Sequence, residues 1–218
     1  MVRRSARGAF ASRLVFPGGA IEADDASAEW EPFVEDFAAF DPDERARRIG
    51  AIRETWEETS ILVGETGGAV DPAGIPTGPG FREFVAKTDV RLRLDALTTF
   101  AHWITPVVEP RRFDTRFFVA HAQAGQVAVA DGGEIVGVEW VSPGDAARAA
   151  RRGESPIIFP TLMNLDRLAE AGSAEAAIVA ALGRPAFTVL PVIETSEDGS
   201  RMIVIPSEAG YAVTRFSP

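Results

Sequence analysis

The sequence predicts an α/β fold, an α/β/α sandwich in which helices cover a mixed central sheet. Short apolar runs typical of strands alternate along the chain with longer stretches of helical periodicity. A glycine turn follows an early strand, and a long capped helix comes after that turn. Because 46% of the 218 residues are apolar, the chain can bury one substantial core. We therefore expect a single domain over residues 1–218.

The N-terminal part predicts a strand, a turn and a helix in that order. Residues 13–16 are expected to form a short strand that ends in Pro17-Gly18-Gly19, where adjacent glycines permit a sharp turn. Asp41-Pro42-Asp43-Glu44 supplies an Asp N-cap and a Pro at the first helical position, which predicts a helix over 42–59. Before the strand, residues 2–8 predict only a shortened first strand at the sheet margin, covered by another segment or a second subunit.

The remaining elements follow from periodicity and turn residues. Aromatic spacing predicts an amphipathic helix over 27–37, although Pro32 limits its start. Residues 64–80 hold six Gly and three Pro and are expected to form a loop. Asp198-Gly199 predicts a hairpin between 187–193 and 202–206. Strands are expected at 98–104, 115–121 and 135–141, and helices at 81–94, 143–152 and 161–182.

Three acidic residues give the predicted helix over 42–59 its chemical character. Glu54, Glu57 and Glu58 are spaced i, i+3 and i+4, so their carboxylates converge on one side of the helix. Clustered carboxylate oxygens are the ligands that hard divalent cations such as Mg²⁺ select. A solvated acidic face is the alternative interpretation. Three apolar side chains fall on the opposite side and would pack on a core: Ile49, Ile52 and Trp56.

Together, the glycine turn and the acidic helix resemble the Nudix box. That motif consists of a Gly, five residues, an acid, seven residues, and then Arg-Glu-U-x-Glu-Glu-x-Gly-U, in which U is a bulky apolar residue. Gly19 fits the first Gly and Asp25 the first acid, while Arg53-Glu54 fits the Arg-Glu pair. Glu57-Glu58 matches the paired acids, and Ile61 matches the last apolar position. The resemblance implies a Nudix fold.

The chain departs from that pattern at four places. Asp25 stands in place of Glu, Thr55 occupies the first U and Ser60 replaces the Gly. In addition, 27 residues separate Asp25 from Arg53 instead of seven, which defines a helical insertion of about 26–48. One Nudix branch resembles this arrangement: the proteins similar to mammalian nucleoside diphosphate-linked moiety X motif 19, which hydrolyse coenzyme A and its esters. Two further runs, 103–106 and 110–118, also resemble that branch, and the resemblance extends over about 2–182. A C-terminal part of helices and hairpin would cover 159–218.

The resemblance implies a divalent-metal-dependent hydrolase of a diphosphate bond. We expect Glu57 and Glu58 to bind Mg²⁺ or Mn²⁺, with a backbone carbonyl of Gly18 or Gly19 as a further ligand. Glu54 is either a third ligand or the base that deprotonates the attacking water. Arg53 lies four residues before Glu57 and can orient a carboxylate.

Residues outside the box complete the expected site. Related enzymes take a further acid from a loop, and Glu134 is that acid in this chain unless it is an ordinary turn carboxylate. Asp114 is expected to pair with a neighbouring arginine. His102 and His121 are assigned no chemistry. Three arginines either bind substrate phosphates or lie on the rim of the site without a role: Arg111, Arg112 and Arg116.

Composition excludes several classes of function. The chain contains no cysteine, which excludes disulfides, thiol nucleophiles and cysteine-based zinc sites. It also argues against the isoprenoid diphosphate isomerases, which share this fold and resemble enzymes that rely on a catalytic cysteine. A net charge of −10 should repel nucleic acid polymers, so we expect a small nucleotide substrate. Without a membrane-length apolar run or signal-peptide pattern, we expect a cytoplasmic protein with no membrane partner; a homodimer is left open.

The leading expected substrate is coenzyme A or acyl-CoA. The alternatives are ADP-ribose, dinucleotides or nucleoside triphosphates, and a non-catalytic Nudix domain that senses a nucleotide. Survival of Glu54, Glu57 and Glu58 favours the enzyme, while Asp25 and Ser60 give mild support to the sensing domain.

Overall fold

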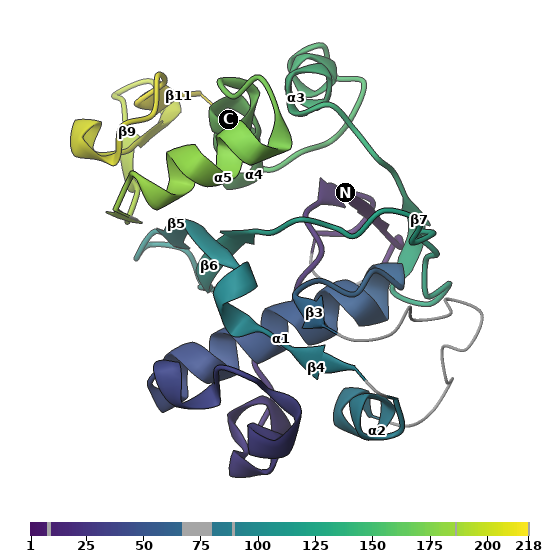
Figure 1. The fold of residues 1–218 in the computed structure, drawn as a ribbon. Coiled ribbons are helices and arrows are strands. Elements are labelled where there is room, and N and C mark those ends of the chain that lie inside the picture. The colour runs from purple at the N-terminus through teal and green to yellow at the C-terminus, as the bar shows by residue number, and fades with distance from the viewer. Residues whose placement is uncertain (8–9, 67–79, 89, 186, 218) are drawn as a thin grey trace. The chain divides into compact units, whose positions relative to one another are not determined.

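A computed structural model of the chain describes residues 1–7, 10–66, 80–88, 90–185 and 187–217 (Figure 1). The Cα positions form two compact units, one of residues 1–97 and 120–141 and the other of 98–119 and 142–218. The single domain over 1–218 stays a prediction. Most of the predicted 64–80 loop lies outside the described residues.

A three-stranded antiparallel sheet in the first unit carries the start of the chain. Its order is β2-β1-β7, with β1 at Val2–Arg4, β2 at Leu14–Val15 and β7 at Ile135–Val138. Val2 is opposite Val15 on one side and Val138 on the other. The prediction that the first strand lies at the sheet margin is therefore wrong, because β1 is hydrogen-bonded on both sides. A two-stranded ladder joins β3, Glu65–Thr66, to β4, Arg91–Leu92.

Helix α1, Pro42–Thr59, confirms the predicted helix at both ends. The Asp41 side chain accepts a hydrogen bond of 2.9 Å from the Glu44 N–H, as an N-cap does. At the other end Ser60 takes the left-handed conformation with φ of 61°. The predicted apolar stripe is buried, which leaves the acidic side of the helix available for other contacts: Ile49, Ile52 and Trp56 are at most 3% exposed.

The segment 24–39 forms three short 3₁₀ helices, so the amphipathic α-helix predicted over 27–37 is wrong. They are η1 (Asp24–Ala26), η2 (Ala28–Phe33) and η3 (Phe37–Ala39). Pro32 lies inside η2 and supplies no N–H for an α-helical ladder. Trp30 is completely buried, with its ring 5.6 Å from that of Phe81. This part of the insertion therefore belongs to the core.

Helix α2, Phe81–Ala86, is shorter than the predicted helix over 81–94. The residues after it follow strand alternation: Val90, Leu92 and Leu94 are buried, whereas Arg91 and Arg93 are exposed. This period of two places Arg91–Leu92 in β4, and the 3₁₀ helix η5 follows at Leu94–Ala96.

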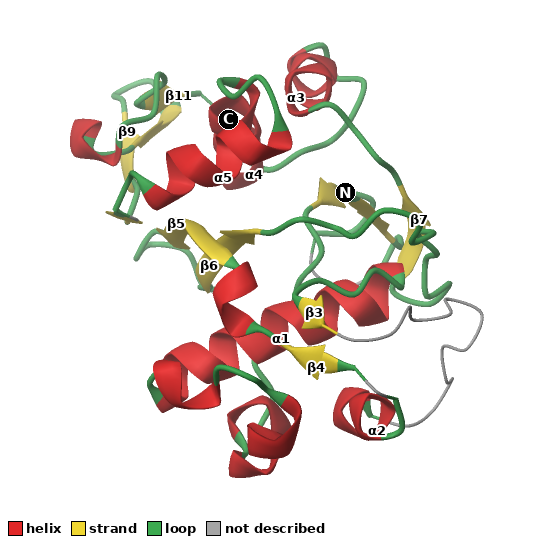
Figure 2. Cartoon of the chain, viewed as in Figure 1, coloured by secondary structure: helices red, strands yellow, loops and turns green. Residues whose placement is uncertain are grey.

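The second unit contains a mixed sheet of order β6-β5-β8. Strand β5, Thr98–Ile104, matches its predicted bounds, and β6 covers Asp114–Val119. The pairing of β5 with β6 is antiparallel, whereas its pairing with β8, Thr188–Val189, is parallel. Figure 2 shows helices and strands succeeding one another along the chain, and the predicted α/β class is confirmed.

Three helices and a small sheet complete the second unit. Helix α3, Pro143–Arg151, confirms the predicted helix there. The single helix predicted over 161–182 is wrong, because Ser173 starts a new helix by accepting from the Ala176 N–H at 3.1 Å. The predicted Asp-Gly hairpin is confirmed between β9 and β10. The bounds are α4 Phe159–Ala169, α5 Ala174–Leu182, β9 Val192–Thr195, β10 Arg201–Val204, the 3₁₀ helix η6 Ser207–Ala209 and β11 Arg215–Phe216. None of the helices in the described part of the chain has the length and apolar character needed to cross a bilayer.

Candidate active site

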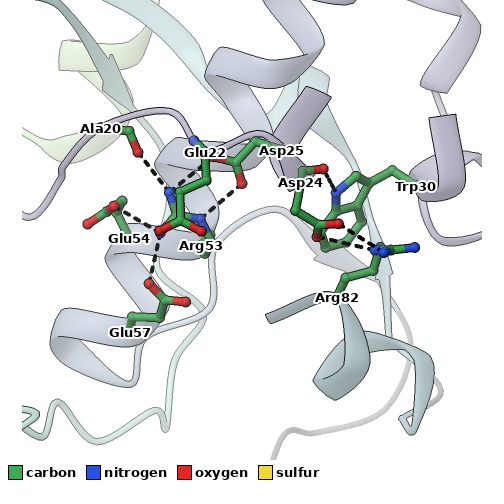
Figure 3. A network of polar contacts seen from close by, with 9 residues as sticks. All are labelled: Ala20, Glu22, Asp24, Asp25, Trp30, Arg53, Glu54, Glu57 and Arg82. Atoms are coloured by element: carbon green, nitrogen blue, oxygen red, sulfur yellow. Dashed lines mark hydrogen bonds and ion pairs between the residues drawn. The ribbon is translucent and has the colours of Figure 1, made fainter. Parts of the chain in front are cut away.

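Arg53 lies at the centre of the polar network in Figure 3. It is 5% exposed, and its Nε and Nη2 donate to the two oxygens of Asp25 at 2.9 and 3.0 Å. Its Nη1 donates to Glu54 Oε1 and to Glu57 Oε2, each at 2.9 Å. Nη2 also donates to the Ala20 carbonyl at 2.9 Å. One guanidinium therefore orients two acids of α1 and joins them to the segment after the glycine turn.

Asp25 fixes this guanidinium from the beginning of the insertion. It is 1% exposed in η1, and its Oδ2 also accepts a hydrogen bond of 2.8 Å from the Glu22 N–H. Gly50 on α1 allows the close approach, since a Cβ there would lie 2.9 Å from Asp25 Oδ2. Asp25 and Arg53 thus form a buried, bidentate pair across the whole insertion.

The glycine turn contacts the other end of the acidic face. Gly18 donates its N–H to Glu58 Oε2 at 2.9 Å, with a φ of 148° that favours glycine. At Gly19, a Cβ would lie only 2.5 Å from the Glu54 carboxylate. The backbone conformation thus favours glycine at Gly18, and a side chain at Gly19 would displace the Glu54 carboxylate from its present position. The Gly18 carbonyl as a metal ligand stays a prediction, because the observed contact uses the N–H.

Arg4, which the sequence reasoning did not include, joins Glu134 to this cluster. Arg4 Nη1 lies 3.6 Å from Glu58 Oε1, and Nη2 forms an ion pair with Glu134. Strand pairing explains the contact, since Arg4 is opposite Ile135, the residue after Glu134. The sequence contained one signal, a basic pair at the end of the first strand, but it did not indicate which acid the pair would meet.

Burial changes the protonation of the box acids. It raises the pKa of Glu58 to about 7, against the opposing effect of the Gly18 N–H. Burial also raises the pKa of Glu54 and of Glu57, although Arg53 opposes the shift in both. For Arg53, burial lowers the pKa, but the hydrogen bond and charge of Asp25 raise it above its ordinary value. The acids thus lie where their charged forms are under-stabilised.

The donor set of the box suits a divalent cation. Within the described residues, no three His, Cys, Asp or Glu side chains are grouped as a metal site, because the acids face Arg53, Arg4 or Gly18. The oxygens are nevertheless all from carboxylates, which hard cations prefer to thiol or imidazole ligands. A cation would stabilise the ionised forms that burial disfavours. The residues therefore suit a hard divalent cation.

The three predicted substrate arginines belong to the second unit, separate from the unit that contains the box. Arg112 donates to the Thr105 carbonyl at 3.1 Å, and the Arg111 guanidinium lies 5.1 Å from the ring centre of Phe113. Arg116 is opposite His102 in the β5–β6 pair. None of the three forms an ion pair within the described residues, so their charges are available.

Asp114 does not pair with an arginine, so that expectation is wrong. Its Oδ1 lies 2.6 Å from His102 Nε2, and His102 Nδ1 lies 2.8 Å from Thr188 Oγ1. The reason is strand geometry: the side chain at position 114 is diagonal to His102 across the β5–β6 pair, and Thr188 is directly opposite it on β8. His102 thus has polar partners on both neighbouring strands.

Comparison with known proteins identifies the family to which the chain belongs. A family model described as the NUDT19 Nudix domain matches residues 34–168, which is more than half of the chain. The chain belongs to the NUDT19 Nudix domain family. A crystal structure of a NUDIX hydrolase from Alicyclobacillus acidocaldarius is similar, with a TM-score of 0.68 and 28% identity. That similarity covers 82% of this chain and 86% of the bacterial one, which confirms the predicted Nudix fold.

Curated relatives extend the comparison within the NUDT19 Nudix domain family. Acyl-coenzyme A diphosphatase NUDT19 of Homo sapiens is 26% identical over 243 residues, covering 85% of this chain and 64% of the human protein. The Xenopus laevis protein of the same name is 28% identical over 222 residues, covering 77% of this chain and 58% of its own length. The chain thus spans about three fifths of the length of these relatives. The predicted branch is confirmed.

Proposed function

We propose that this protein hydrolyses the diphosphate bond of coenzyme A or acyl-CoA. The observation that carries the proposal is the Arg53 cluster, in which one buried guanidinium holds Glu54 and Glu57 on the helix face that also bears Glu58. The names of the human and frog relatives support coenzyme A esters as the substrate class. Products would be phosphopantetheine, or its acyl form, and adenosine 3′,5′-bisphosphate, since one water adds across the P–O–P link.

Mg²⁺ or Mn²⁺ would be held by Glu57 and Glu58, with Glu54 as a third ligand or as the base. The bound cation would neutralise charge on the non-bridging phosphate oxygens. Arg53 keeps the carboxylates in place, and Asp25 fixes Arg53. Glu134, held by Arg4, is the second acid able to accept the proton of the attacking water.

Arg111, Arg112 and Arg116 would bind substrate phosphates or the 3′-phosphate. Their unpaired charges support this role, because a chain of net charge −10 must otherwise repel a polyanionic substrate. The cytoplasmic location and the homodimer stay predictions.

The proposal is tested with a substrate panel and one charge-removing variant. Coenzyme A, acyl-CoA, ADP-ribose, a dinucleotide and a nucleoside triphosphate are incubated with Mg²⁺ or Mn²⁺, and the products are identified by mass. We expect Glu57→Gln to lose Mn²⁺ binding and to turn over at least roughly 10²-fold more slowly, the scale on which catalytic groups act. Glu83→Gln, which removes an exposed partner of Lys87 on α2, is the matched control.

Three results would contradict the proposal. Preferential cleavage of ADP-ribose, dinucleotides or triphosphates would assign another substrate. Tight nucleotide binding without any product would favour the sensing domain. Wild-type turnover in folded Glu57→Gln would remove the metal assignment.

A further inference from the structure

A buried arginine in the second unit lacks a carboxylate partner. Arg167 on α4 is 9% exposed, and within the described residues no acid lies within 4.0 Å of its guanidinium. Its Nη2 donates to the Ala209 carbonyl, and its Cζ lies 3.4 Å from the ring centre of Tyr211. Its Nε is buried and has no hydrogen-bond partner among those residues. These contacts satisfy only part of a group that carries five N–H donors.

A second donor on the same face of α4 also lacks a partner. Asn164 precedes Arg167 by three positions and is completely buried. Its Oδ1 accepts from Trp103 Nε1 at 3.3 Å and from Tyr211 OH at 2.7 Å, which fixes the orientation of the amide. Its Nδ2 then has no acceptor in the described part of the chain. This face of α4 therefore has more donors than acceptors.

Such an arrangement is costly unless something compensates it. Arginines are almost never fully buried without a partner, and an uncompensated buried charge costs several kcal/mol. Deprotonation gives no relief, since a guanidinium stays charged in proteins. Burial lowers the pKa of Arg167 and nearby Arg184 lowers it further, while Tyr211 and Glu170 act in the opposite direction. An anion beside Arg167 would supply the compensation that these contacts leave out.

A pocket of about 310 Å³, open to solvent on one side, adjoins this arginine. Three charged residues line it: Arg167, Arg184 and Glu170. Glu170 lies 4.0 Å from Arg184, so the lining contains two guanidinium groups and one carboxylate. The rest of the lining is largely apolar, with Phe100, Leu168 and four alanines of α5. The volume is roughly ten times the ~30 Å³ that one water occupies in the liquid, enough for a carboxylate and a short carbon chain.

Arg167 and Glu170 also line a second pocket of about 310 Å³. Its other charged lining residues, Arg151 and Asp166, form an ion pair with each other. Because the first pocket adds the charge of Arg184 and an apolar wall, it suits an organic anion better.

We propose that the second unit binds a short-chain aliphatic carboxylate in the pocket lined by Arg167 and Arg184. The guanidinium charge selects the carboxylate, and the alanines, Phe100 and Leu168 accept the chain. Inorganic phosphate shares the anionic chemistry but cannot use the apolar wall. The site uses none of the Nudix box acids.

The test measures hexanoate binding by calorimetry and by its effect on the melting temperature. We expect hexanoate to raise the melting temperature of the full chain in a concentration-dependent way, and phosphate to do so much less. Arg167→Met should raise the Kd for hexanoate by roughly tenfold or more, the scale of a hydrogen bond to a charged group. Without hexanoate, Arg167→Met should be at least as stable as the wild type, since an uncompensated charge is gone. Arg148→Met, at an exposed arginine paired with Asp145, is the control.

Other results overturn the proposal. If no carboxylate binds and Arg167→Met loses stability, the arginine acts only through Ala209 and Tyr211. If phosphate binds as tightly as hexanoate, the apolar wall has no role and the carboxylate class is wrong. Should Arg167→Met fail to fold, Arg184→Met, at a half-exposed position of the same wall, must still weaken hexanoate binding. The readout is binding, so failure to hydrolyse coenzyme A would leave this result unaffected.

Discussion

Replacing Asp25 with Asn should destabilise the protein strongly, because it removes one charge from a buried pair. The Asp25 oxygens accept from Arg53 Nε, Arg53 Nη2 and the Glu22 N–H. In either orientation the Asn amide would present its NH₂ to at least one of these donors. Arg53 would keep Glu54 and Glu57 as partners, so the cost is that of leaving buried donors unsatisfied, and we expect a loss of about 1–3 kcal/mol in the free energy of unfolding.

The neighbouring residue provides the control. Asp24 pairs with Arg82 at 2.9 Å, but its side chain is 45% exposed, and such a surface pair contributes about 0–1 kcal/mol. Urea unfolding of wild type, Asp25→Asn and Asp24→Asn, all with a metal chelator, compares the three free energies directly. Equal losses for the two variants, or a loss below about 1 kcal/mol for Asp25→Asn, would refute the view that the pair anchors the site.

Three further changes test other contacts. Gly19→Ala should slow coenzyme A hydrolysis by roughly 10²-fold, because its Cβ would lie 2.5 Å from the Glu54 carboxylate. Gly80→Ala is the control, since a Cβ there has nothing within 4 Å and should leave the rate unchanged. Equal rates for the two variants would contradict this prediction. Trp30→Ala should lower the free energy of unfolding by about 3–5 kcal/mol in urea, and an unchanged value would exclude the insertion from the core. Arg4→Met should lower kcat, and in a Glu134→Gln background the same change should add little; full additivity would show that Arg4 does not act through Glu134.

Helix α1 was predictable because its signals are local. Asp41, Pro42 and the apolar stripe all lie within the helix or at its cap, and each keeps in the structure the role that its spacing predicts. The contact of Arg53 with Glu57 follows from one helical turn in the same way. Local sequence signals were therefore sufficient to predict the helix and its acidic face.

Contacts across distant segments were not predictable. Whether Arg4 meets Glu58 and Glu134 depends on the pairing of the first strand with β7, more than 130 residues away in the chain. Asp114 has arginine neighbours in sequence, yet its partner is His102 because strand pairing brings the two side chains together. Periodicity contains no information about which strand lies beside which.

Some local errors had local causes. The helix predicted over 161–182 is interrupted before Ser173, which starts a new helix. Composition did not reveal this break, because alanine favours helix on both sides of it. Around Leu92, buried residues at every second position indicated a strand, and the helical interpretation overlooked that period.

The Asp25–Arg53 pair also determines how freely the segment between its members can vary in length. The two residues close a loop of 27 residues, where the Nudix pattern has seven. Closure entropy grows only with the logarithm of loop length, so nearly two doublings cost roughly 1.2 kcal/mol. Burying Trp30 alone contributes about as much or more. A Nudix box of this kind can therefore accommodate a long insertion at little cost in free energy, provided that the insertion buries at least one large side chain.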